Sequence, residues 1–256
     1  MTTVGIVQAR TTSSRLARKV LLDLAGAPLI IRMLERVERA RALDAVWVAT
    51  STDQTDDELA RVVDRRGTSV FRGSLEDVLS RFQAVAERTG ADVVVRLTGD
   101  CPLHDPDVID SAVRLFRDAC GQVDYLSNTL EPTYPDGLDV EVLSRAALER
   151  AHREAKLPLE REHVTPYISG ASRRAPGFRR AQLRAPGDFS QLRWSVDEPQ
   201  DLEFVRAVFA VLLPENPHFG WLDVVALLTR EPELLQLNRH LKRNEKFLKQ
   251  LEQSRP

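Results

Sequence analysis

Cysteine is scarce in this chain of 256 residues, because only Cys101 and Cys120 are present and they form no Cys-x-x-Cys motif. Two such cysteines build no disulfide framework and are typical of a reducing compartment. Long apolar runs are also lacking, since no stretch approaches the roughly 18 residues that cross a membrane. The short apolar run before Arg10 is too brief for a secretory signal. We therefore expect a soluble, cytoplasmic protein with no membrane partner.

A strong excess of positive charge is absent as well. Lysine and arginine number 36, aspartate and glutamate 38, and the formal net charge is -2. This balance argues against a dedicated nucleic-acid-binding protein. The sequence has neither a Walker A motif nor a Gly-x-Gly-x-x-Gly fingerprint, so it lacks the usual signals of P-loop and dinucleotide-binding proteins.

Short β-branched runs alternate with helical patterns through the first half of the chain. Strands are predicted over 4–8, 45–49, 69–71 and 92–97. Helices are predicted over 29–37, 56–65, 75–85 and 108–116, with a stop at Gly90. Strands separated by helices of this length indicate right-handed crossovers and a mostly parallel, Rossmann-like α/β sheet.

The alternation is weaker after Tyr125. Residues 129–190 contain six prolines, and we interpret them as an insertion that covers a site or forms a subunit contact. A strand near 192–196 and a helix over 199–212 restore the pattern, and an amphipathic helix is expected over 238–253. The predicted organisation is a main domain over 1–212 and a helical tail over 213–256.

Three loops follow predicted strands, where open α/β sheets bind ligands. The first, residues 8–19, combines hydroxyl side chains with Arg10, Arg15, Arg18 and Lys19. Cations and free backbone amides at a strand-to-helix turn suit a polyphosphate. A solvated basic loop is the alternative interpretation.

The second and third loops each contribute an acidic side chain. Asp100 follows the strand over 92–97, and Asp197 follows the predicted strand near 192–196. Magnesium prefers one or two such carboxylates together with substrate phosphates. An ordinary turn at Asp100 and a helix cap at Asp197 are the alternatives. A cationic loop combined with two carboxylates is what nucleotidyl transfer requires, which favours the functional interpretation.

Two polar segments of the insertion are candidates for binding an acceptor through sugar-hydroxyl contacts. The first covers 134–141 and the second covers 160–167. The candidate residues are Tyr134, Asp136, Asp139, Glu141, Glu162 and His163. A surface turn and an ion-paired helix start are the alternative.

Several motifs in order make the chain resemble a known family. They include Gln-Ala-Arg-x-x-Ser-x-Arg-Leu-x-x-Lys over 8–19, Arg-Leu-Thr-Gly-Asp-Cys-Pro over 96–102, and Ser-Val-Asp-x-Pro-x-Asp-Leu over 195–202. Phe-Arg-Gly-Ser-x-x-Asp-Val-Leu-x-Arg over 71–81 and Tyr-Pro-Asp-Gly-Leu-Asp-Val-Glu over 134–141 belong to the same set. The chain resembles the SpsF family of spore-coat polysaccharide synthesis. That family is similar to the cytidylyltransferases that activate 3-deoxy-manno-octulosonate and acylneuraminate.

The resemblance implies a nucleotidyltransferase (GT-A-like) fold and a set of site residues. It places Arg10, Ser13, Arg15 and Lys19 on the CTP phosphates, and makes Asp100 and Asp197 ligands of Mg²⁺. Lys19, Arg10, Arg15 and Asp100 are the implied catalytic residues. The implied nucleotide-binding residues also include Gln8, Ala9, Arg72, Gly73, Ser74 and Thr98, with Asp77 and Arg81 in support. The family's Leu-Pro-Gly-Lys is Leu-Ala-Arg-Lys over 16–19, which changes this loop.

The resulting hypothesis is a cytidylyltransferase that moves CMP from CTP to a small, sugar-like acceptor and releases pyrophosphate. Similar enzymes also imply a homodimer. Two alternatives stay open, a metal-dependent glycosyltransferase that uses a nucleotide sugar and a non-catalytic nucleotide-binding partner protein. The acceptor itself is not specified by the sequence.

Overall fold

The computed structural model describes residues 1–172, 177–243 and 245–253. Its centre is a seven-stranded sheet in the order β5-β4-β1-β6-β8-β7-β9. The strands are β1 (Thr3–Gln8), β4 (Ala45–Ser51), β5 (Ser69–Gly73), β6 (Val93–Thr98), β7 (Tyr125–Ser127), β8 (Glu141–Ser144) and β9 (Arg180–Gln182). All pairs are parallel except those that β8 forms with β6 and β7. The α/β, mostly parallel sheet is therefore confirmed.

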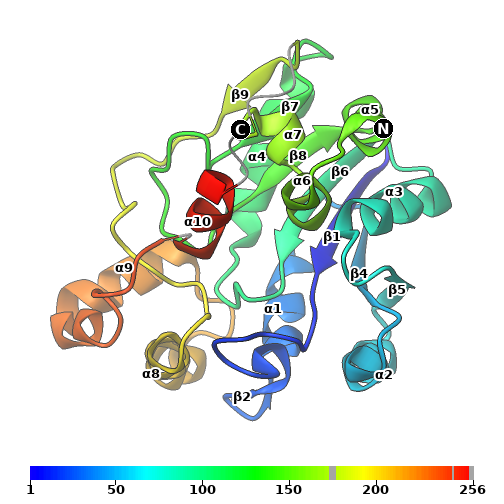
Figure 1. The fold of residues 1–256 in the computed structure, drawn as a ribbon. Coiled ribbons are helices and arrows are strands. Elements are labelled where there is room, and N and C mark those ends of the chain that lie inside the picture. Colours follow the sequence, from blue (N-terminus) through cyan, green and yellow to red (C-terminus); the bar gives the residue numbers. More distant parts are fainter. Residues whose placement is uncertain (173–176, 244, 254–256) are drawn as a thin grey trace.

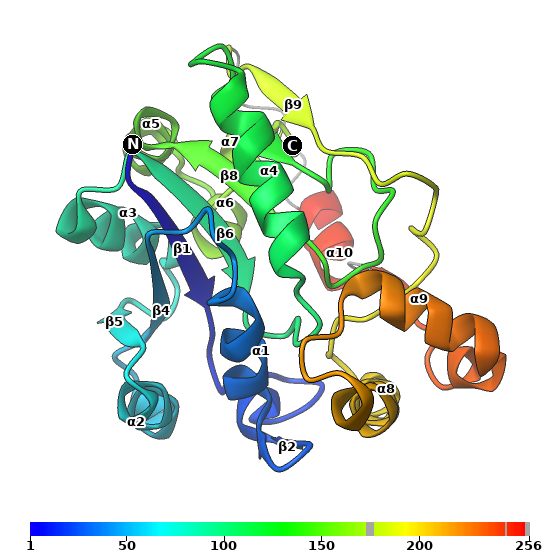
Figure 2. The same ribbon diagram turned by 180° about the vertical axis from the view of Figure 1, so that it is seen from behind.

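Helices cover both faces of the sheet (Figures 1 and 2). One face carries α1 (Leu29–Val37), α2 (Asp57–Arg66), α4 (Pro106–Asp118), α8 (Pro199–Glu215) and α9 (Trp221–Arg230). The other carries α3 (Val78–Thr89), α5 (Arg145–Glu154), α6 (Pro158–His163) and α7 (Pro166–Ser169). One apolar cluster lies on each face of the sheet, between the strands and the helices. Because the central strands β1 and β6 are buried on both faces, their sequences are continuous apolar runs.

The remaining short elements connect these layers. They are β2 (Asp23–Leu24), β3 (Ala27–Pro28), α10 (Glu245–Gln253) and three short 3₁₀ segments, Lys19–Leu21, Gln54–Asp56 and Pro232–Gln236. No helix in the described part of the chain is long and apolar enough to span a bilayer.

Side-chain caps explain where the helices after the strands begin. Asp77 accepts a hydrogen bond from the backbone N–H of Ser80 at the start of α3, and Asp105 accepts two at the start of α4. These caps satisfy backbone donors that lack a partner within the helix. Gly90 ends α3 in the left-handed conformation, as predicted. The caps place the first turns of α3 and α4 next to the carboxyl ends of β5 and β6.

Two predictions about secondary structure are wrong. Residues 192–196 form no strand of the sheet, because their extended backbone pairs with the loop at Asp136 in a single isolated bridge. The backbone N–H of Val196 instead donates to the carbonyl of Asp100. The C-terminal helix begins only at Glu245, since Asn238 to Arg243 form turns that contact the core of the site.

The segment 129–190 is built into the sheet. It supplies β8, which lies between β6 and β7, and the edge strand β9. It also supplies α5, α6 and α7 on one face. Its predicted role in a subunit contact stays a prediction, as does a domain boundary after residue 212, where α8 continues.

Candidate active site

Three loops meet beyond the carboxyl ends of β1 and β6. The backbone N–H of Gly99 donates to the carbonyl of Gln8, which joins the loop after β6 to the end of β1. The bond from Val196 to Asp100 adds the third loop. Although 192–196 is not a strand of the sheet, its contacts bring Asp197 to the place where the sequence predicted it.

Lys19 lies at the centre of this meeting point. Its ammonium donates to Asp100 Oδ2 at 2.8 Å and to Asp197 Oδ1 at 2.7 Å. Lys19 is buried and begins a short 3₁₀ segment (Lys19–Leu21). The two carboxylates therefore face one another across a single nitrogen atom.

The loop that carries Lys19 forms a hydrogen-bonded turn despite the altered motif. Arg18 replaces the glycine of the family motif and adopts a left-handed backbone with φ of 55°. This conformation costs a non-glycine residue about 1 kcal/mol. The carbonyl of Thr11 accepts hydrogen bonds from Ser13 and Arg18, and the backbone N–H of Thr11 donates to buried Asp56 at 2.7 Å. These bonds fix both ends of the turn.

The charges at this point stabilise one another. Burial alone would raise the pKa of Asp100, but the adjacent Lys19 ammonium outweighs burial and holds that pKa far below its usual range. Burial would lower the pKa of Lys19, and the two carboxylates raise it instead. At neutral pH the centre therefore contains an ionised carboxylate at Asp100 and a protonated lysine.

Two arginines of the same loop flank Lys19. Arg15 contacts Asp197 at 2.9 Å and Glu198 at 3.5 Å, and Arg10 donates to Glu162 of α6 at 3.0 Å. Each guanidinium is about one-third exposed. These cations are accessible to a polyphosphate that competes for them with the carboxylates.

A cavity of about 790 Å³ opens beside these residues. Most of the predicted site residues line it, namely Gln8, Ala9, Arg10, Ser13, Arg15, Lys19, Thr98, Asp100, Asp136, Asp139, Glu141, Glu162, His163 and Asp197. Its volume is in the range of pockets that hold small-molecule ligands.

Four predicted residues are not part of this lining. Arg72 turns away and donates to the carbonyl of Ser51 and to Asp57 at the start of α2. Gly73 and Ser74 also lie outside the lining, and Ser74 accepts from the backbone of Asp77. Tyr134 packs edge-on against Trp221, with ring centres 5.4 Å apart. The predicted contacts of these four residues with a nucleotide or an acceptor therefore stay predictions, because none of the four lines this cavity.

Acidic side chains form one wall of the cavity, which we call the acid wall: Asp136, Asp139 and Glu141. Glu141 pairs with Arg96 and accepts from the Tyr125 hydroxyl at 2.5 Å. Burial raises the pKa of Asp139, and burial together with the charge of Asp139 raises that of Asp136 to about 7. The acid wall thus offers hydrogen-bond acceptors to a ligand rich in hydroxyl groups.

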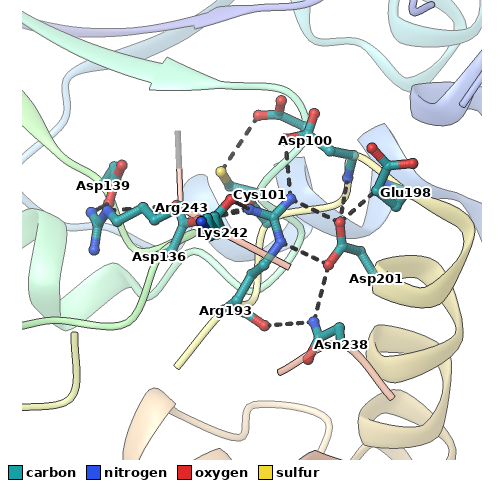
Figure 3. A network of polar contacts seen from close by, with 12 residues as sticks. Asp100, Cys101, Asp136, Asp139, Arg193, Glu198, Asp201, Asn238, Lys242 and Arg243 are labelled. Carbon is teal, nitrogen blue, oxygen red and sulfur yellow. Dashed lines mark hydrogen bonds and ion pairs between the residues drawn. The ribbon is translucent and has the colours of Figure 1, made fainter. Parts of the chain in front are cut away.

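A network of polar contacts behind the acid wall was not predicted (Figure 3). Buried Arg193 donates to Asp201 through Nε and Nη2, both at 2.9 Å, and also contacts Asp136 and Asp197. Arg193 thereby links a carboxylate of the centre to the acid wall. The spacing of four residues from Arg193 to Asp197 and from Asp197 to Asp201 was a usable signal, although the resemblance assigned a role only to Asp197.

The C-terminal strap, residues 238–243 and 245–250, completes the site. Arg243 donates to Asp139 at 2.6 Å, and the carbonyl of Lys242 accepts from Arg193 at 2.9 Å. Phe247 lines the cavity and stacks edge-on against His163, while Gln250 hydrogen-bonds the His163 ring at 2.9 Å. The sequence showed only an amphipathic pattern here, which says nothing about such long-range contacts.

Comparisons with known proteins agree with this geometry. The sequence model of a family described as cytidylyltransferase matches residues 4–193. The chain is 34% identical over 236 residues to the spore coat polysaccharide biosynthesis protein SpsF of Bacillus subtilis, covering 89% of this chain and 94% of SpsF. It is 31% identical over 238 residues to a 3-deoxy-manno-octulosonate cytidylyltransferase of an Anaeromyxobacter species, covering 80% and 96% of the two chains.

A solved structure is similar over nearly the whole chain. It is a cytidylyltransferase from Leptospira borgpetersenii, with 30% identity, a TM-score of 0.86, and coverage of 92% of this chain and 97% of that one. The family model ends at residue 193, before the strap begins. The chain therefore belongs to the cytidylyltransferase family and is a CTP-dependent nucleotidyltransferase.

Proposed function

We propose that this enzyme transfers CMP from CTP to a small, sugar-like acceptor in a Mg²⁺-dependent reaction that releases pyrophosphate. The observation that supports this most is the shared contact of Asp100 and Asp197 with the Lys19 ammonium, at 2.8 and 2.7 Å. Two carboxylates and a lysine that meet beyond the carboxyl edge of the sheet are the groups that a nucleoside triphosphate and its metal ion require.

The residues present fit magnesium. Asp100 is ionised at neutral pH, and Asp197 faces the same point. Within the described residues no group of three or more acidic, histidine or cysteine side chains forms a metal cluster. Magnesium is commonly held by one or two carboxylates, with phosphates and waters as its other ligands. Asp100 and Asp197 would hold it, and the bound ion would supply charge neutralisation at the phosphates.

The cations of the first loop bind the triphosphate in this proposal. Lys19, Arg10 and Arg15 exchange their contacts with carboxylates for contacts with phosphate oxygens. Charge stabilisation and the fixed position of the α-phosphate then provide most of the rate acceleration. The oxygen of an acceptor hydroxyl attacks the α-phosphorus, the bond to the bridging oxygen breaks and pyrophosphate leaves, while the hydroxyl proton passes to water.

The acceptor binds at the acid wall in this proposal. Sugar hydroxyls donate hydrogen bonds, and Asp136, Asp139 and Glu141 accept them. SpsF is named for polysaccharide biosynthesis, and the Anaeromyxobacter relative for 3-deoxy-manno-octulosonate, a sugar acid. A sugar-like acceptor used in polysaccharide biosynthesis follows from both names and from the hydroxyl-binding chemistry of the wall.

The test is CTP-dependent release of pyrophosphate with a panel of nonulosonic acids, sugar phosphates and phosphonates. The variant Asp100→Asn should lose on the order of a hundredfold or more in turnover. The matched control is Asp107→Asn, on the exposed first turn of α4, which should leave turnover unchanged. Full activity of Asp100→Asn contradicts the role of Asp100. Release of a nucleoside phosphate from nucleotide sugars, with no pyrophosphate from CTP, indicates a glycosyltransferase instead.

A further inference from the structure

Arg81 is a buried cation of the cavity lining without an ion-pair partner among the described residues. Its side chain is 2% exposed, and its Nη1 donates to the carbonyl of Ala49 at 3.2 Å. Its Nε has no hydrogen-bond partner. Burial lowers the pKa of Arg81 to about 10 although the charges of Asp56 and Asp77 raise it, so the group stays charged at neutral pH. Burying a charge without a paired carboxylate is costly, which indicates a role for its donors beyond packing.

The place of Arg81 in the fold separates it from the acid wall. It extends from α3 to the carboxyl end of β4, which is the neighbour of β1 on the side away from β6 and β8. Leu75 and Val78 line the cavity beside it, together with Ala9 at the start of the phosphate-binding loop. A flat heterocycle fits this arrangement. Its faces can pack against the apolar side chains, and one of its edges can accept hydrogen bonds from Arg81, which only donates them.

We propose that Arg81 is the residue that selects cytosine over uracil, an inference that rests on the proposed function above. Cytosine presents two adjacent acceptors, O2 and N3, and the planar guanidinium carries matching donors in a rigid fork. Uracil carries a hydrogen on N3, so one N–H of Arg81 faces another N–H. A fork that matches two acceptors on one base discriminates against the wrong base by roughly tenfold to hundredfold.

Gly73 keeps Arg81 in this position. A Cβ atom at residue 73 would lie 2.9 Å from Cγ of Arg81 and 3.1 Å from the Phe71 ring. The first distance is closer than real Cβ contacts allow, and Cγ lies near the base of the arginine side chain, so Arg81 must shift. Gly73→Ala therefore displaces the guanidinium while keeping its charge.

The experiment is isothermal titration of the full-length protein with CTP and with UTP, each with Mg²⁺. The quantity of interest is the ratio of the two dissociation constants. The wild-type protein should bind CTP at least tenfold more tightly than UTP. Arg81→Lys keeps the charge but loses the fork, and Arg81→Gln loses both, so each should bring the ratio close to one. Gly73→Ala should lower the ratio by a smaller factor.

The matched control is Arg88→Gln, an exposed arginine of the same helix that stacks over Trp47 and should leave the ratio unchanged. If Arg81 is purely structural or binds phosphate, its substitution should weaken the binding of CTP and UTP equally and leave the ratio of their dissociation constants unchanged. That result overturns the inference. Equal binding of CTP and UTP by the wild-type protein overturns it as well. If the wild-type protein binds neither nucleotide, the proposed function itself fails. Thermal unfolding of each variant shows whether it is folded, and Gly73→Ala provides a second route if a substitution of Arg81 prevents folding.

Discussion

Replacing Asp201 by asparagine is expected to destabilise the protein strongly. The carboxylate of Asp201 is fully buried and accepts hydrogen bonds from five N–H donors. They are Arg193 Nε at 2.9 Å, Arg193 Nη2 at 2.9 Å, Asn238 Nδ2 at 3.0 Å, and the backbone N–H groups of Asp197 and Glu198 at 3.0 Å each. An asparagine accepts through one oxygen only, so its NH₂ group would face at least two of these donors.

The size of the loss follows from the burial of both partners. Arg193 is 5% exposed and Asp201 is 0% exposed, so the pair is not solvated by water. Removing one charge of such a pair costs about 3–5 kcal/mol. A domain has only about 5–15 kcal/mol of stability in total, so this variant should unfold at a much lower denaturant concentration.

The assay is urea unfolding at pH 7, with Asp188→Asn as the control because Asp188 is exposed and accepts a hydrogen bond from the backbone of Ser190, two residues away. Burial would raise the pKa of Asp201, but the Arg193 contacts outweigh it and lower that pKa below 3.8. The stabilisation is therefore complete above pH 3.8 and is lost as the pH falls further. A loss below about 1 kcal/mol at pH 7 would refute the reasoning, since that is the range of an ordinary surface contact.

Three further predictions concern other parts of the site. Gly137→Ala should destabilise the protein by about 2 kcal/mol or more in the same urea assay. The φ angle of Gly137 is +106°, and a Cβ there would lie 2.7 Å from the backbone of Trp194 and Ser195, so unchanged stability contradicts this. Burial raises the pKa of Asp136 to about 7, so the contribution of this group to stability should fall as the pH rises from 3.8 to 7. The difference in thermal stability between the wild-type protein and Asp136→Asn should therefore change over that range, and a constant difference contradicts this. A thiol-specific reagent should modify exposed Cys120 in the native protein, but buried Cys101 only after denaturation, because burial raises the pKa of the Cys101 thiol. Rapid modification of both cysteines in the native protein contradicts this.

The sequence predicted the elements whose pattern depends on burial alone. Strands β1, β4, β5 and β6 and helices α1 to α4 lie where apolar periodicity placed them, because each has a face against the core. The meeting of the loops that carry Lys19 and Asp100 could also be predicted, since parallel strands bring their carboxyl ends to one edge. Asp197 joins them through the bond from Val196 to Asp100 and not through a strand of its own. Both inferences use local pattern and general topology, and they need no knowledge of individual contacts.

The strand predicted near 192–196 and the contacts of Arg72 both depend on long-range partners. The pattern of apolar and polar residues around Trp194 predicts a strand. In the structure these residues pair with the loop at Asp136 and not with a neighbouring strand. Arg72 has the right motif for a nucleotide, but carbonyls and a carboxylate of the β4–α2 connection hold its guanidinium. Neither outcome is visible in the composition of the segment itself, because each partner is distant in sequence.

The network at Arg193 explains why the C-terminal strap belongs to the catalytic unit. Arg193 contacts Asp197 at 3.3 Å and Asp136 at 3.2 Å, and it also donates to the carbonyl of Lys242 in the strap. Asn238 of the strap donates to the carbonyl of Arg193, so the strap binds both ends of that residue. A shift of the strap therefore changes the position of a proposed magnesium ligand and of the acid wall together. Since one buried side chain connects both, we expect the strap to influence where the nucleotide and the proposed acceptor lie relative to one another.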